Sequence, residues 1–171
     1  MKLALAALLL VSPSPSFAQA APPSPSPARV AAQRRLDFLE GEWSGEGWMQ
    51  AGPRRTTFTS REIVTREAGG LALLVKGRHL AGERVVHDAL GVLAANDDGT
   101  YTFSSWLANG LSGAHAGEWQ DGAFVWRMDT PAGRVRYTIR LDAQGRWHEV
   151  GERLGEGGAS PFFEMTLSRS R

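Results

Sequence analysis

The chain has 171 residues, no cysteine, and 19 basic against 18 acidic side chains. Without cysteine, the protein has no disulfides, no thiol catalysis and no cysteine-ligated zinc or iron–sulfur centre. The near-zero net charge argues against nucleic acid as a partner, because phosphate binding needs a local excess of positive charge. Stability must come from an apolar core, and the chain is long enough to bury one.

The first twenty residues have the layout of a secretory signal. Lys2 precedes the apolar run Leu3 to Val11, and a cleavage point follows at Ala20. This run is less than half of the ~20 apolar residues that a membrane-spanning helix needs. The sequence therefore predicts a periplasmic or secreted protein that is not integral to the membrane. Residues 21–27 are rich in proline and serine, which favours a flexible leader.

A short amphipathic helix is expected within residues 28–39, directly before a glycine-punctuated strand. That strand carries Gly41, Trp43, Gly45 and Gly47. A large ring at this point can fill the closed end of a barrel, while the glycines let the backbone bend and approach its neighbours closely. We interpret these four residues as structural.

From residue 41 the apolar pattern changes to period two, which is typical of strands with one buried face. Short turns such as Asp121-Gly122 predict that consecutive strands are antiparallel neighbours. A long meander closes on itself, because its twist accumulates and open edges are costly. The expected fold is all-β, a single antiparallel up-and-down β-barrel over residues 28–171 with a short N-terminal helix. The ten expected strands are residues 42–50, 55–65, 71–80, 84–94, 100–108, 113–119, 123–129, 135–141, 146–154 and 162–169.

Strand parity predicts which side chains fill the barrel, because alternate residues face opposite sides of a strand. The interior rings either plug the barrel or line an apolar pocket, and the tendency of ten-stranded barrels to retain a cavity favours the pocket. Parity leaves the face of Trp106 open. The candidate ligand-binding residues are Trp106, Trp126, Tyr137, Trp147, Glu149 and His79.

Glu149 shares the face of Trp147, so an inward ring predicts an inward carboxyl. Such a group must find a donor or have a raised pKa. One interpretation is a salt bridge to Arg153 or Arg127; another is a polar anchor for a ligand. A catalytic acid or base would need a second group placed against Glu149, and the sequence identifies none.

No local motif indicates catalysis or metal binding. The four histidines lack metal-ligand spacing, and His79 is interpreted as a core or pocket-rim residue. The run Gly110-Leu111-Ser112-Gly113 does not match the nucleophile elbow of serine hydrolases. We expect no catalytic residue, no metal and no cofactor.

Several segments together resemble a bacterial lipocalin-like family of unknown function, within the calycins. They are residues 41–47, Gly91-Val92-Leu93, residues 147–152 and residues 162–167, and the likeness spans roughly Leu36 to Arg169. The plan is also similar to the haem-binding nitrobindins, which share a Gly-x-Trp-x-Gly entrance and a ten-stranded barrel. Those ligate haem through a histidine near the C-terminal strands, whereas residues 162–169 contain none, so the resemblance in fold does not imply haem.

The resemblance also implies a structural pair. In lipocalins, the entrance tryptophan packs against an arginine near the end of the last strand, which caps carbonyls of the N-terminal helix. Trp43 and Arg169 occupy the matching places.

The leading hypothesis is an exported lipocalin-like barrel that binds a small apolar or amphipathic molecule in its interior, with haem as a variant of that hypothesis. The alternative is an envelope accessory protein with a filled barrel and a protein partner. An enzyme that uses Glu149 as acid or base ranks third. The sequence does not indicate the oligomeric state or the ligand.

Overall fold

The computed structural model describes residues 24–170. The predicted signal peptide, residues 1–20, and residues 21–23 of the predicted leader lie outside the described residues. Helix α1 (Pro27–Arg34) begins where the Ser26 hydroxyl accepts a hydrogen bond from the amide of Arg29, with a proline in the first turn. A short 3₁₀ segment, η1 (Asp37–Leu39), connects the helix to the first strand.

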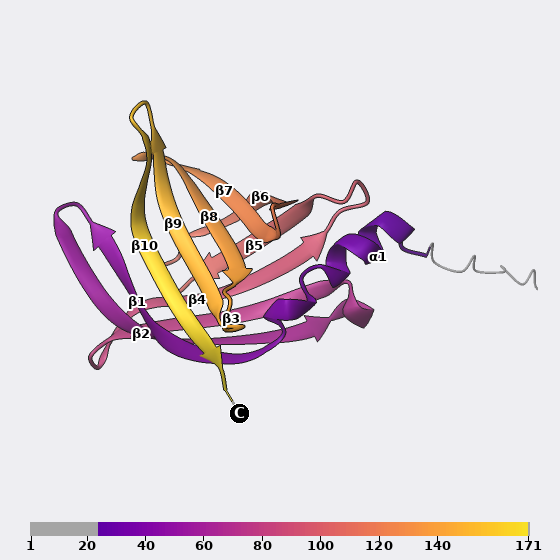
Figure 1. Cartoon of the computed structure of the whole chain (residues 1–171), viewed down its shortest axis with the longest axis horizontal. Helices are drawn as coiled ribbons and strands as arrows, with labels where there is room; N and C mark the ends of the chain where they lie inside the picture. Colours follow the sequence, from indigo (N-terminus) through magenta and orange to yellow (C-terminus); the bar gives the residue numbers. More distant parts are fainter. Residues whose placement is uncertain (1–23, 171) are drawn as a thin grey trace, which may run out of the picture.

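Ten antiparallel strands form one closed barrel, as the sequence predicts (Figure 1). Each strand pairs with its neighbours in the chain, and β1 pairs with β10 to close the sheet. The bounds agree with the predicted ones to within a few residues. The strands are β1 (Gly41–Ala51), β2 (Arg54–Glu67), β3 (Ala72–Ala81), β4 (Arg84–Ala95), β5 (Tyr101–Leu107), β6 (Ser112–Gln120), β7 (Ala123–Thr130), β8 (Gly133–Leu141), β9 (Trp147–Gly155) and β10 (Gly158–Arg169).

The two ends of the barrel differ. Helix α1 lies at the end where β2 connects to β3 and β8 connects to β9, while the β1–β2 and β9–β10 turns lie at the other end (Figure 1). The second 3₁₀ segment, η2 (Ala68–Gly70), makes the β2–β3 connection. We call the α1 side the closed end and the opposite side the open end.

Trp43 fills the closed end. Its ring is fully buried, and its indole Nε1 donates to the Leu39 carbonyl at 2.8 Å. The Arg169 guanidinium lies 4.3 Å above this ring and donates to the carbonyls of Phe38 and Glu40. The implied structural pair of Trp43 and Arg169 is therefore present, and it holds the segment after α1 against the barrel.

The glycines of β1 are required by close packing. A Cβ atom on Gly45 would collide with the carbonyl oxygen of Thr166, and one on Gly47 would lie 2.5 Å from that of Glu164. Gly41 has a φ of 127°, a conformation that favours glycine, and a Cβ atom there would meet Arg169.

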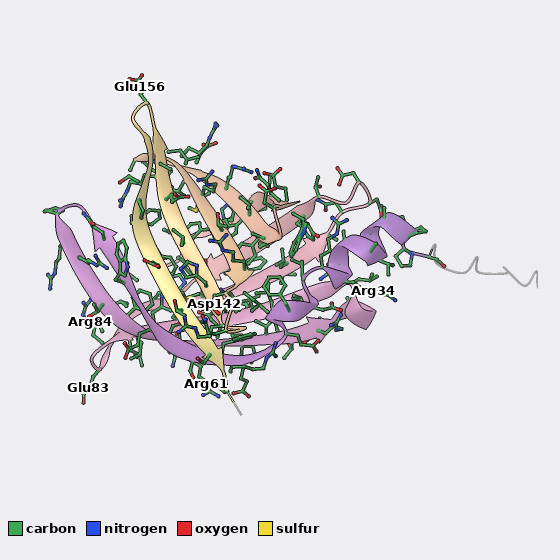
Figure 2. The ribbon with its side chains drawn as sticks, viewed as in Figure 1. Arg34, Arg61, Glu83, Arg84, Asp142 and Glu156 are labelled. Carbon is green, nitrogen blue, oxygen red and sulfur yellow. The ribbon has the colours of Figure 1, made fainter. Side chains whose placement is uncertain are left out.

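Charged side chains cover the outside of the barrel. Arg61, Glu83 and Glu156 point away from it in Figure 2. Ion pairs such as Arg61 with Glu42, at 2.8 Å, join neighbouring strands on this exposed face, where each contributes little to stability. Within residues 24–170, no helix has the length and apolar character needed to cross a membrane.

Candidate functional site: a cavity inside the barrel

The interior above the closed end is hollow. It contains a cavity of about 370 Å³ whose lining includes Leu107, Leu111 and Ser112 from the open end. Such a volume lies at the lower end of the ~300–1,000 Å³ that small-molecule sites span. Most of the wall is apolar. The space suits a small molecule better than an extended chain.

Aromatic rings form much of the wall. The indole of Trp126 stacks on the ring of Tyr137 with centroids 4.3 Å apart, and Phe103 meets Trp126 edge-on at 5.0 Å. Phe163 and Trp147 also line the cavity. The strands place these side chains inward by the alternation that the sequence predicted, and flat rings at this spacing present a firm apolar surface to a guest.

A buried carboxyl, Glu62 on β2, lies in this mainly apolar wall. It is 5% exposed, and its Oε1 accepts a hydrogen bond from the Ser60 hydroxyl at 3.1 Å. Burial raises the pKa of Glu62 to about 8, and the Ser60 hydrogen bond opposes the shift. The carboxyl has room because Gly77 lies opposite on β3; a Cβ atom there would lie 2.5 Å from Oε2.

Two histidines lie beside this carboxyl. His79 Nε2 is 3.2 Å from Oε1 of Glu62, and its ring is stacked between Phe58, at 4.4 Å, and His87, at 4.7 Å. Burial lowers the pKa of both histidines to about 4, and for His87 the charge of His79 adds to the shift. Near neutral pH, His79 and Glu62 are therefore both uncharged, and their contact is a neutral hydrogen bond.

Glu149 on β9 is the second buried carboxyl. It is 8% exposed and its Oε2 accepts a hydrogen bond from the Trp147 indole at 3.2 Å. Burial, and then the charge of Glu62, raise the pKa of Glu149 to about 8. The two carboxyls line the same cavity from β2 and β9, so the structure supplies a second acid near Glu149 that the sequence did not identify.

The predicted salt bridge of Glu149 is also absent from the described residues. Arg153 instead donates to the Gln50 carbonyl at 2.9 Å and lies over the ring of Phe162. Arg127 faces outward, where it pairs with Glu118 at 2.6 Å. Glu149 remains buried because it is held neutral, the alternative to ion pairing for an acid in apolar surroundings.

Trp106 does not belong to the cavity. It is 50% exposed and pairs across the ladder with Leu90 of β4, while its neighbour Ser105 faces inward. Parity alone left its face open, and the β4–β5 register settles it. The other five candidates, Trp126, Tyr137, Trp147, Glu149 and His79, all line the cavity.

Sequence reasoning missed Glu62, Ser60 and His87. A signal was present in β2, because Ser60 and Glu62 lie on the same parity as Phe58 and Val64 and therefore interrupt an apolar row. His87 was harder to place, since the register shifts by one residue between β3 and β4 next to His79.

No protein-family model and no curated protein matches the chain. Solved structures do match. The crystal structure of Rv2717c from M. tuberculosis is 15% identical, with a TM-score of 0.64 over 86% of this chain and 100% of the other. The ileal bile acid-binding protein of zebrafish, solved with cholic acid, is 10% identical, with a TM-score of 0.50 over 78% of this chain and 99% of the other.

The fold is a lipocalin-like barrel. At 10–15% identity these likenesses establish the fold alone. They agree with the lipocalin-like fold that the sequence resemblance implied.

Proposed function

We propose that this protein is exported and that its lipocalin-like barrel binds a small apolar or amphipathic molecule in the interior cavity. The observation that carries the proposal is the aromatic-walled cavity of about 370 Å³, whose lining also includes polar side chains. Protein interiors are normally close-packed, so a cavity of this size has room for a ligand whose contacts with the wall would add packing energy. The cholic acid complex of the bile acid-binding neighbour supports the same use of the fold.

The chemistry of the wall favours a molecule with two parts. Trp126, Tyr137 and Phe103 offer flat apolar contact, while Glu62, Glu149 and His79 are grouped polar side chains that line the same space. An apolar body against the rings with one polar group at the acids satisfies both.

Native mass spectrometry of the protein purified gently from its own host tests the proposal. A reproducible bound mass is expected and would define the ligand class, and a Soret band after haem titration would identify haem. In addition, titrating lipids and aromatic metabolites should change the fluorescence of Trp126 and Trp147. A clean apo mass together with unchanged fluorescence for every ligand would refute the proposal. If the protein is exported, its intact mass should match that of a chain beginning at Ala21.

A matched pair of variants separates binding from folding. Ala89→Phe puts a ring into the cavity, whereas Ala94→Phe makes the same change on β4 at a position of the opposite parity. We expect Ala89→Phe to abolish ligand-induced fluorescence changes and Ala94→Phe to retain them. Equal behaviour of the two variants would place the ligand outside the barrel.

A second candidate function is an interaction protein of the envelope. Trp106 at 50% exposure and Leu90 at 39% lie side by side on the outer face, where they help to line a groove over strands β2 to β5. An exposed apolar pair of this kind is typical of contact surfaces. A photo-crosslinking amino acid at position 106, compared with one at the outward position 150, tests this candidate: one defined crosslinked partner at 106 alone would favour it.

A further inference from the structure

We infer that the cavity selects lipophilic amines, binding an ammonium group between the carboxyls of Glu62 and Glu149 with the apolar part of the molecule against the aromatic wall. This inference rests on the proposed ligand-binding function and names its ligand class.

The charged side chains of the cavity lining favour a cation. Glu62 and Glu149 are its acids, and within residues 24–170 no arginine or lysine lines the cavity. A carboxylate ligand would therefore enter without a cation to meet it, next to two acids. An ammonium would meet two groups able to become its counter-charge.

Both acids are held in place by one of their two oxygens. Glu62 and Glu149 are 5% and 8% exposed and line the cavity. Oε1 of Glu62 contacts the Ser60 hydroxyl and Nε2 of His79, while Oε2 of Glu149 accepts from the Trp147 indole.

The carboxyls have acceptor capacity to spare. Among the described residues, Oε2 of Glu62 and Oε1 of Glu149 receive no hydrogen bond. When one of the two carboxyls ionises, its free oxygen becomes a charged acceptor, and no arginine or lysine of the described lining competes for it. A primary ammonium has three donors and no acceptor, so it can donate to this ionised carboxyl. The faces of Trp126 and Tyr137 add cation–π attraction for a positive ligand.

The other titratable groups that face these acids do not supply a positive charge. His79 on β3 and His87 on β4 have pKa values lowered to about 4 by burial, and burial also lowers the pKa of His115 on β6. Burial raises the pKa of Tyr137 on β8, so it stays neutral. Arg153 on β9 is engaged with the Gln50 carbonyl and is not part of the lining.

Binding of an amine should release a proton from the cavity, which can be measured. With pKa values raised to about 8, both acids are protonated in the empty cavity at pH 7. Binding an ammonium ion there ionises one carboxyl, and that proton leaves to the buffer. A neutral alcohol releases none, and a carboxylate takes one up to become neutral. Affinity for the amine should therefore rise by up to about tenfold per pH unit between pH 6 and 8.

Calorimetry tests the preference for amines and the proton release. Three probes that share one ring type are used: phenethylamine, phenethyl alcohol and phenylacetate. At pH 7, in two buffers of different ionisation enthalpy, we expect the amine to bind about tenfold or more tightly than the other two and to release close to one proton. Glu149→Gln should lower amine affinity about tenfold or more and leave alcohol affinity within about threefold. Glu164→Gln, which makes the same change in an outer carboxyl beside His148, is the control and should bind like the wild type.

Tighter binding of the alcohol or of phenylacetate, or amine binding without proton release, would overturn the amine inference and leave the container function standing. Failure of all three probes to bind would also overturn it. The proposed function would be refuted as well only if, in addition, the protein from its host showed a clean apo mass and no ligand changed its tryptophan fluorescence. The proton count is measured on the wild type, so the test does not depend on a variant that folds.

Discussion

Buried polar groups have hydrogen-bond partners at the closed end, whereas several of those in the cavity lack them in the part of the chain that the structure describes. At the closed end, the indole of Trp43 donates to Leu39 at 2.8 Å, the hydroxyl of Tyr101 donates to Ala32 at 2.8 Å, and Gln33 Oε1 accepts from the Ala95 amide at 2.8 Å. Apart from Nε2 of Gln33, these buried side chains satisfy their polar atoms within the described chain. This region is built for stability.

In the cavity, the polar groups cost stability. Two carboxyls are buried without a cation, one histidine nitrogen has no partner among the described residues, and both carboxyls line a cavity of about 370 Å³. Evolution tolerates such groups where they perform a task, so the contrast points to the cavity as the functional region and to the closed end as its support.

The largest expected effect tests whether the closed end carries the stability. Trp43→Ala removes a fully buried ring, its hydrogen bond and its contact with Arg169, and should lower the free energy of unfolding by about 3–5 kcal/mol. Trp106→Ala makes the same change on the outer face and should cost no more than about 1 kcal/mol. Urea unfolding measures both. Similar losses in the two variants would show that the closed end does not carry the stability.

The next effect tests the cost of the buried acids. Glu62 and Glu149 keep their protons to about pH 8 in the folded state, whereas the unfolded chain loses them near 4.5. The folded state therefore binds more protons above pH 4.5, and its stability falls as pH rises towards 8. At about 1.4 kcal/mol per pH unit for each group, the loss between pH 6.5 and 8 reaches up to about 4 kcal/mol.

Below pH 6.5 an opposite effect enters. His79 and His87 stay neutral in the folded state down to about pH 4, while the unfolded chain takes up protons near 6.5, so their contribution to stability is lost as pH falls. The two effects should nearly cancel between pH 4.5 and 6.5. Urea unfolding from pH 5 to 8.5 should show a plateau followed by an alkaline decline. The double variant Glu62→Gln, Glu149→Gln should lose the decline, and a flat wild-type profile above pH 6.5 would show that the acids are not held neutral.

The same contrast explains what the sequence could predict. The ten strands, the closure and the pair of Trp43 and Arg169 followed from period-two alternation, short turns and the resemblance, because these are local or strongly patterned features. Inward placement of Trp126, Tyr137 and Glu149 followed from the same parity.

The set of polar side chains in the cavity could not be predicted from the sequence, because it depends on which strands face each other across the barrel. Glu62 and Glu149 come from β2 and β9, and their coupling is visible only once the sheet is closed. The register shift beside His79 brings His87 opposite it, and no local pattern announces such a shift. The predicted salt bridge to Arg153 failed for a related reason: a shared strand face does not fix where a long side chain ends.

Removing the arginine of the closed end should have a smaller effect than removing its tryptophan. Arg169→Ala loses two donors to the carbonyls of Phe38 and Glu40 and the contact above Trp43, which should cost about 2 kcal/mol. Arg134→Ala removes an exposed ion pair with Asp129 and should change stability by less than about 0.5 kcal/mol. Thermal unfolding compares the two, and an equal response would mean that Arg169 does not cap the helix segment.

The smallest effect compares one hydroxyl in each region. Tyr101→Phe leaves the Ala32 carbonyl with the Arg35 amide as its donor and removes the hydrogen bond that joins α1 to the barrel, so it should cost about 1 kcal/mol in urea unfolding. Tyr137→Phe removes a hydroxyl that makes no hydrogen bond with the described residues, in a wall that already holds excess polar groups, so stability should stay the same or rise. We argue that the closed end has completed its hydrogen bonds and that the cavity leaves polar groups free for a ligand. Loss of one hydroxyl should then lower stability at the closed end and leave it unchanged or raise it in the cavity. A larger loss in Tyr137→Phe than in Tyr101→Phe would reverse that assignment.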